Sequence, residues 1–180
     1  MARKKNNLKS EIVAVLCDIR SIHNVGSIFR TADGACVSKI YLCGITPSPV
    51  DRIGNYIRQF SKVSLGAERH LEWEKAKSAL RVVKKLKAEG FKILAIEQAK
   101  NSIFYYKAKM RGGASKIALV VGSEIGGVPQ AVLKLTNEIL EIPMRGAIVR
   151  HARHPRRTGS GKESLNVSVA FGIVAYELNR

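Results

Sequence analysis

Residues 117–127 read IALVVGSEIGG, and this stretch indicates the fold class of the whole chain. Its first five residues are all apolar, which is typical of a strand buried on both faces of a sheet. The glycine-rich residues that follow predict a loop beyond the carboxyl end of that strand. Because ligands of open parallel sheets lie beyond the carboxyl ends of the strands, this loop is also a candidate site.

Comparable patterns recur along the rest of the chain. Apolar runs predict four more strands, at residues 12–17, 39–43, 91–96 and 139–142. Apolar residues at helical spacing predict four helices, the first ending at Gly34 and the others over about 73–86, 129–135 and 166–178. Residues 51–67 are ambiguous, and residues 101–115 read as a basic loop. Strands that alternate with helices predict an α/β domain with a mostly parallel sheet flanked by helices.

The charge balance favours a polyanionic partner. The chain has 180 residues, and 31 Lys and Arg against 14 Asp and Glu give a formal net charge of +17. A compact domain repels itself at that charge, and nucleic acid is the commonest compensating partner. A membrane surface is disfavoured, since no long amphipathic basic helix is present in the pattern. We expect residues 1–10 to be a disordered basic arm and residues 11–180 to form a single domain.

The cysteines and histidines predict neither a metal site nor a disulfide framework. Cys17, Cys36 and Cys43 lack a metal-ligand or redox spacing, so buried free thiols of a cytoplasmic protein are expected. His151 and His154 have no acidic or cysteine partner nearby, and no metal is expected there. No apolar run approaches the ~18 residues of a membrane span, and the N-terminus is too charged for a signal peptide.

Three segments that follow predicted strands carry the polar residues of interest. They are NVGSIFRTA at 24–32, VVGSEIGGV at 120–128, and a third made of IPMRG at 142–146 with SLNVSVA at 164–170. Each alone is a weak signal, because glycines also make turns and Asn166 or Ser168 could simply cap a helix. Together and in this order they resemble the SpoU/TrmH family of RNA ribose methyltransferases, within the SPOUT class, over nearly the whole chain.

The resemblance implies a fold, a cofactor and a product. It implies that the α/β domain has a C-terminal trefoil knot and forms a homodimer with the active site at the subunit interface. It implies S-adenosyl-L-methionine as methyl donor, S-adenosyl-L-homocysteine as its spent form, and a 2′-O-methylated ribose in RNA as product. Transfer RNA fits a small enzyme of this kind slightly better than ribosomal RNA does.

The family pattern also carries over to single residues. It implies a cofactor pocket with largely main-chain contacts, lined by Val121, Gly122, Ile142, Met144 and Leu165. It implies that Arg30 acts at the reacting ribose or its phosphate from the opposite subunit, and that Asn24 holds Arg30 or the RNA. Glu124, Ser164 and Asn166 would orient those groups. Arg30 could be the base that takes the ribose proton or a fork that binds the 3′ phosphate.

One stretch departs from the family pattern, a basic insertion inside the third motif at residues 147–160. It could be a flexible surface excursion, because longer loops cost only ~0.6 kcal/mol per doubling of length. It could instead be an RNA-contacting flap, which four arginines favour: Arg150, Arg153, Arg156 and Arg157. It could also impair cofactor binding.

Two other functions compete with the methyltransferase hypothesis. A non-catalytic RNA-binding protein on the same fold is disfavoured by the intact set Asn24, Arg30, Glu124 and Asn166. A different nucleotide-using enzyme is disfavoured because neither a Gly-Lys-Ser/Thr loop nor a GxGxxG helix start is present.

Overall fold

The computed structural model describes residues 10–108, 116–144 and 164–180. The helices (α), 3-10 helices (η) and strands (β) follow one another in this order: β1 (Glu11–Cys17), α1 (Ile22–Gly34), β2 (Lys39–Cys43), α2 (Arg58–Ser64), η1 (Ala67–Arg69), β3 (Glu72–Ala76), α3 (Ala79–Ala88), β4 (Lys92–Ile96), β5 (Ile103–Phe104), η2 (Tyr105–Lys107), β6 (Lys116–Val121), α4 (Gln130–Leu133), β7 (Glu138–Glu141) and α6 (Val167–Leu178).

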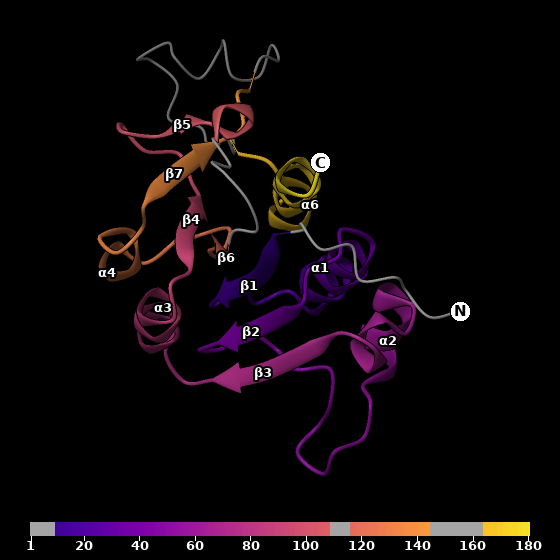
Figure 1. Cartoon of the computed structure of the whole chain (residues 1–180). Coiled ribbons are helices and arrows are strands. Elements are labelled where there is room, and N and C mark those ends of the chain that lie inside the picture. Colours follow the sequence, from indigo (N-terminus) through magenta and orange to yellow (C-terminus); the bar gives the residue numbers. More distant parts are fainter. Residues whose placement is uncertain (1–9, 109–115, 145–163) are drawn as a thin grey trace, which may run out of the picture.

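The strands of the described residues form one sheet in the order β3-β2-β1-β6-β4-β7-β5. All neighbouring strands in it are parallel, which confirms the predicted sheet type. The chain adds β2 and β3 outward from β1 and then crosses to the other side of β1, where β6 lies between β1 and β4. Figure 1 shows α1, α2 and α6 on one face of the sheet and α3 and α4 on the other.

The central strand β1 is buried on both faces, as its unbroken apolar run predicts. Alternate side chains pack into two different cores, because successive residues of a strand point to opposite faces. The core beneath α1, α2 and α6 takes Ile12, Ala14 and Leu16. The core beneath α3 and α4 takes Val13, Val15 and Cys17. Helices on both faces of a parallel sheet confirm the predicted α/β class.

The helix predicted over residues 73–86 is wrong in its first part. Residues 72–76 form β3, whose Trp73 lies in register with Ile40 of β2, and α3 begins only at Ala79. β3 is an edge strand with mostly exposed side chains, so it has no apolar run to mark it. Ser78 caps α3 by accepting a hydrogen bond from the Arg81 amide (3.4 Å), a sequence signal that marks the true helix start. Gly90 ends the helix at φ +85°, as expected.

Two stretches without a firm prediction also contain regular structure. Residues 58–64 form α2 within the ambiguous stretch, and residues 103–107 form β5 and η2 within the expected basic loop. Among the cysteines, Cys17 and Cys43 are buried as expected, but Cys36 is exposed. Burial raises the pKa of Cys43 to about 12, so this thiol stays protonated at neutral pH.

Several predictions fall on parts of the chain outside the described residues. Residues 1–9 of the expected basic arm lie outside the described residues, and so does the insertion at 147–160 with its four arginines. The knot depends on the path of residues 145–163 and stays a prediction for the same reason. No helix in the described part of the chain is long and apolar enough to cross a membrane.

Candidate functional site

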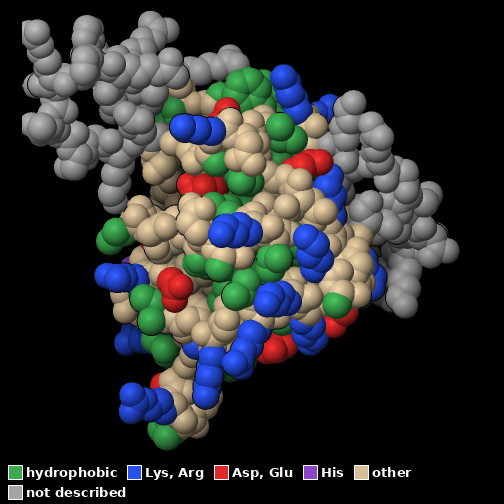
Figure 2. Space-filling model, turned by 90° about the vertical axis from the view of Figure 1, so that its left-hand side faces the viewer, with side chains coloured by type: hydrophobic (Ala, Val, Ile, Leu, Met, Phe, Trp, Pro, Cys, Tyr) green, Lys and Arg blue, Asp and Glu red, His purple; other side chains and the backbone are tan. Residues whose placement is uncertain are grey.

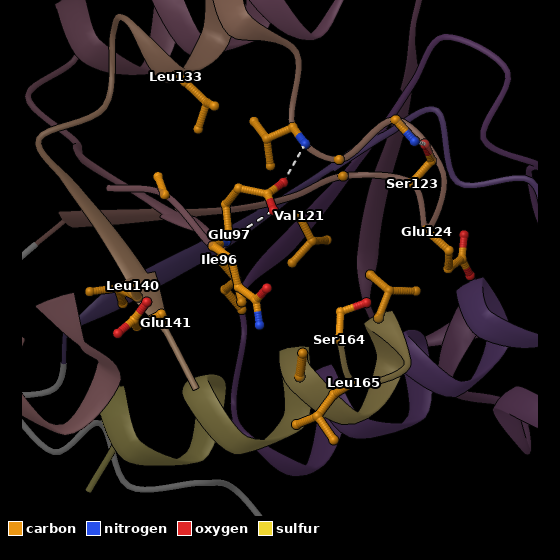
Figure 3. A pocket seen from close by; sticks show the side chains of 18 of the residues that line it. Ile96, Glu97, Val121, Ser123, Glu124, Leu133, Leu140, Glu141, Ser164 and Leu165 are labelled. Carbon is orange, nitrogen blue, oxygen red and sulfur yellow. Dashed lines mark hydrogen bonds between the residues drawn. The ribbon is translucent and has the colours of Figure 1, made fainter. Parts of the chain in front are cut away.

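A cavity of about 490 Å³ lies at the carboxyl ends of β6, β4 and β7, beside the first turn of α6 (Figure 3). Apolar side chains make up much of its lining: Ile96, Val121, Leu140, Ile142 and Leu165. Three carboxylates also line it, from Glu97, Glu124 and Glu141. No lysine or arginine of the described residues does, although the chain as a whole carries a formal net charge of +17. The described lining of the cavity is therefore acidic, in a chain that is basic as a whole.

The cavity brings together residues from two of the three predicted motifs. Val121, Gly122 and Glu124 of the second motif line it, and so do three residues of the third: Ile142, Ser164 and Leu165. Met144 is half-buried and is not one of the lining residues. The carboxyl ends of parallel strands position these segments, as expected for a ligand site in an open sheet.

The glycine-rich loop after β6 folds back on itself at the wall of the cavity. The Gly127 amide donates a hydrogen bond to the Ser123 carbonyl (2.8 Å), and the Gly126 amide donates one to Ser123 Oγ (3.1 Å). A Cβ on Gly122 would lie 2.0 Å from the Gly127 carbonyl carbon. Gly122 is thus required for the close approach of the loop to itself, and it also lines the cavity as the family pattern implies.

Glu97 is a site residue that the sequence analysis missed. It follows β4, and its carboxylate accepts hydrogen bonds from the amides of Val128 (2.9 Å) and Gln98 (3.0 Å), drawn dashed in Figure 3. The bond from Val128 ties the glycine-rich loop to the end of the neighbouring strand, and the bond from Gln98 holds the Glu97 carboxylate against its own backbone. The available signal was a carboxylate directly after the apolar run at 91–96, the placement that singled out the other motifs.

A chain of hydrogen bonds joins the first motif to the other two. Asn24, in the first turns of α1, donates from Nδ2 to Glu124 Oε1. Asn166 donates from Nδ2 to Asn24 Oδ1 (3.1 Å). The Asn166 side chain also caps α6, since its Oδ1 accepts from the Ser168 amide (2.9 Å) and Ser168 Oγ (2.7 Å). Asn166 therefore fixes the start of α6 against α1 and is more than a helix cap.

Arg30 does not line the cavity within the described chain. It is exposed on α1 and lines a separate hollow with Lys62 of α2 and Tyr176 of α6. The structure thus brings Asn24, Glu124 and Asn166 together and leaves Arg30 apart from them. Among the described residues, no group of three or more His, Cys, Asp or Glu side chains could hold a metal ion.

Comparisons with known proteins identify relatives along most of this chain. The model of the SpoU rRNA Methylase family matches residues 11–149. The 23S rRNA (guanosine-2′-O-)-methyltransferase RlmB of Vibrio vulnificus is 28% identical over 172 residues, which cover 95% of this chain and 60% of the relative. The chain thus spans about three fifths of the length of that curated relative.

Solved structures agree on the fold. The AdoMet-bound rRNA methyltransferase from Sinorhizobium meliloti has a TM-score of 0.75 at 24% identity, with 96% of this chain and 57% of that chain covered. A structure described as giving structural insights into the 2-OH methylation of C/U34 on tRNA has a TM-score of 0.68 at 25% identity. In that pair, 94% of each chain is covered.

Proposed function

Because the chain belongs to the SpoU rRNA methylase family, we propose that it transfers a methyl group from S-adenosylmethionine to a ribose 2′-hydroxyl of structured RNA. One observation carries the proposal: the hydrogen bonds from Glu124 through Asn24 to Asn166 unite the three motifs beside the cavity. A ligand in the cavity and an RNA strand on α1 would meet at these side chains.

The properties of the cavity fit this cofactor. Its volume of about 490 Å³ is within the range of small-molecule pockets, about 300–1,000 Å³. S-adenosylmethionine carries a positive sulfonium, a positive ammonium group and one carboxylate, so its net charge is positive. The three carboxylates of the cavity suit such a cation, and no lysine or arginine stands among the described lining residues. The same charges oppose the phosphates of ATP or NAD, which weighs against a different nucleotide-using enzyme. When bound, the cofactor supplies an activated methyl group on its sulfur.

The residues of the chain would hold and orient the reactants. The apolar wall of Val121, Ile142 and Leu165 would shield the cofactor from water. Asn24, fixed from both sides by Glu124 and Asn166, would present a rigid polar surface to the RNA. We assign Arg30 to the phosphate beside the target ribose, because a guanidinium is a poor base but a good bidentate partner for phosphate.

A homodimer would bring Arg30 to the cavity of the second subunit. The helix α6 reads VSVAFGIVAYEL, and its outward side chains Val169 and Tyr176 are 50% and 57% exposed. A helix that is apolar on nearly all sides is typically buried, so a second copy of this chain would cover this face. Tyr176 also lines the hollow that contains Arg30, so Arg30 would lie beside such an interface.

The dimer and the shared site can be tested together. Val169→Glu should give a monomer in light scattering. The control Ala88→Glu adds the same charge to the exposed face of α3 and should leave a dimer. Arg30→Ala and Asn166→Ala subunits, each inactive alone, should recover roughly a quarter of the wild-type rate after mixing, since half of the dimers would contain one intact site. No recovery in a confirmed mixed dimer would contradict a shared site.

The reaction itself is tested with methyl-labelled S-adenosylmethionine. Purified protein is given separate tRNA and rRNA fractions from cells that lack the gene, and the RNA is digested with alkali. We expect label in alkali-resistant dinucleotides from tRNA, supported by the 25% identical tRNA-related structure, whose match covers 94% of each chain. Labelled mononucleotides would indicate base methylation. No label with RNA binding intact would indicate a non-catalytic RNA-binding protein.

A further inference from the structure

The segment between β2 and α2 forms a compact projection, residues 48–57, which we name the finger. It extends from the body of the molecule at the lower edge of Figure 1. Val50 and Tyr56 pair as an antiparallel bridge across its base. At its tip, Asp51 Oδ1 accepts hydrogen bonds from the amides of Ile53 (2.9 Å) and Asn55 (2.9 Å). These bonds hold the tip in one shape without help from the core.

The finger holds an apolar side chain and positive charges in solvent. Ile53 at the tip is 83% exposed, and residues 51–56 are all exposed. Arg69 lies over the Tyr56 ring, with 4.9 Å between the guanidinium carbon and the ring centroid. Arg52 and Arg58 have no ion pair within the described part of the chain. The projection with its basic and apolar side chains is visible at the bottom of Figure 2.

The carboxylate within the finger is occupied by the turn. Asp51 accepts the two amide hydrogen bonds described above, so its carboxylate stabilises the turn at the tip. The outward charge that remains in the finger is that of Arg52, and Arg58 follows at the start of α2; both complement a polyanion. Ile53 adds an exposed apolar side chain beside these charges, which can contact the face of an unstacked base.

The finger is also connected to the proposed site. α2 follows it directly and packs against α1, where Phe60 lies edge-on to Phe29 at 5.1 Å between ring centroids. Gln59 and His23 are hydrogen-bonded across the two helices (2.9 Å). Lys62 of α2 shares the hollow of Arg30. A basic path therefore runs from the finger along α2 to Arg30.

We propose that the finger binds unpaired nucleotides of the RNA next to the methylated ribose. This inference rests on the proposed function for its substrate and goes beyond it by assigning a recognition element. Arg52 and Arg58 contact phosphates, while Ile53 and the Tyr56–Arg69 pair contact the faces of unstacked bases. Aromatic rings and guanidinium planes are the usual stacking surfaces for such bases, which a double helix does not expose.

Two substitutions of Asp51 separate a shaped finger from simple charge attraction. Asp51→Ala and Asp51→Asn both remove one negative charge, but only the asparagine can still accept the two amide hydrogen bonds. The probes are a stem-loop RNA with an unpaired loop and a duplex RNA of the same stem, and affinity is measured by fluorescence anisotropy. We expect Asp51→Asn to bind the stem-loop at least as tightly as the wild type. We expect Asp51→Ala to bind it several-fold more weakly. Equal tightening by both variants would show attraction by charge alone and overturn the proposal.

Two further substitutions test the tip of the finger, and the second of them has a matched control. Ile53→Ser should weaken stem-loop binding by about tenfold, the effect of losing one base contact, and should leave duplex binding unchanged. Arg52→Glu should weaken RNA binding and flatten its salt dependence. Lys84→Glu makes the same charge change on the exposed face of α3 and should have a smaller effect on both. If Ile53→Ser leaves RNA binding intact and instead dissociates the dimer, the finger is a protein interface and the proposal is wrong.

Failure of the inference can be told from failure of the proposed function. Calorimetry with S-adenosylmethionine reports on the cavity, which the finger does not line. Normal cofactor binding and methylation by every finger variant would refute the finger and leave the enzyme proposal standing. If instead the wild type binds no cofactor and the finger variants lose stem-loop binding, the enzyme proposal fails and the assignment of the finger stands.

Discussion

The hydrogen bond between Asn24 and Glu124 can be inverted without changing the size of either side chain. In the wild type, the Asn24 amide donates to the Glu124 carboxylate while its carbonyl oxygen accepts from Asn166. Asn24→Asp keeps the acceptor toward Asn166 but sets a second carboxylate against Glu124. Glu124→Gln removes the charge and keeps an oxygen that can accept. The double variant places a carboxylate at position 24 and an amide at position 124, so donor and acceptor are exchanged.

The expected effects follow from the type of bond and its half-buried setting. Asn24→Asp loses a hydrogen bond to a charged group, a contribution of about 1.5–3 kcal/mol to the free energy of unfolding. Repulsion between two carboxylates adds about 1 kcal/mol or more near the surface. We expect a total loss of about 2.5–4 kcal/mol for this variant and about 1 kcal/mol for Glu124→Gln. The double variant should lose clearly less than the sum, a coupling of about 2 kcal/mol.

Urea unfolding followed by circular dichroism measures all four proteins of this cycle, and methyl transfer to RNA is measured beside it. The stability readout matters because Glu124 would also shape the site, so activity alone does not isolate the bond. Asn24→Asp should recover part of its stability as the pH falls and one carboxylate takes up a proton. Single effects that simply add, within about 0.5 kcal/mol, would refute a structural link between the first and second motifs.

Three other substitutions test further features. Gly122→Ala should displace the loop at 122–128 and lower cofactor affinity in calorimetry at least tenfold, because its Cβ would lie 2.1 Å from the Gly127 carbonyl oxygen; unchanged affinity would contradict the loop geometry. Arg30→Lys should retain RNA binding but lose most methyl transfer, since an ammonium cannot hold a phosphate bidentately, and near-normal turnover would exclude both roles considered for Arg30. Burial raises the pKa of Glu68, but hydrogen bonds from Ser64 Oγ (2.5 Å) and Ser61 Oγ (2.7 Å) outweigh it and hold the pKa below its ordinary value. At neutral pH the wild type should therefore have a larger free energy of unfolding than Glu68→Gln, and this difference should shrink as the pH falls below about 4.5. A difference that stays constant between neutral and acidic pH would contradict the lowered pKa.

Strands with two buried faces were predictable, and those at the sheet edge were not. An unbroken apolar run such as 12–17 is short and rich in β-branched residues, which favours a strand with two buried faces over a helix. The edge strand at 72–76 has only two half-buried side chains, Trp73 and Ala76, and their separation of three residues fits a helical spacing. The two-residue strand β5 is too short to leave any periodic signal.

The site was predictable to the extent that it lies in motifs along the chain. Asn24, Glu124 and Asn166 were selected from three segments, and hydrogen bonds join them in the structure. The placement of Glu97 directly after the run at 91–96 was an available signal, but its role could not be predicted, because that role depends on the backbone amide of Val128, 31 residues further along the chain. The role of Gly122 likewise depends on how the loop folds back, which no residue spacing reports.

The position of β1 has a consequence for synthesis on the ribosome. This strand is complete at residue 17, but its second neighbour, β6, ends at residue 121. At about 5–20 residues per second, the interval between them lasts on the order of 5–20 s. During that time the strand destined for the middle of the sheet is an open edge with apolar side chains on both faces. A nascent chain stalled before residue 116 should be held by chaperones or aggregate, whereas one stalled well after residue 121 has the partner strand that closes this edge.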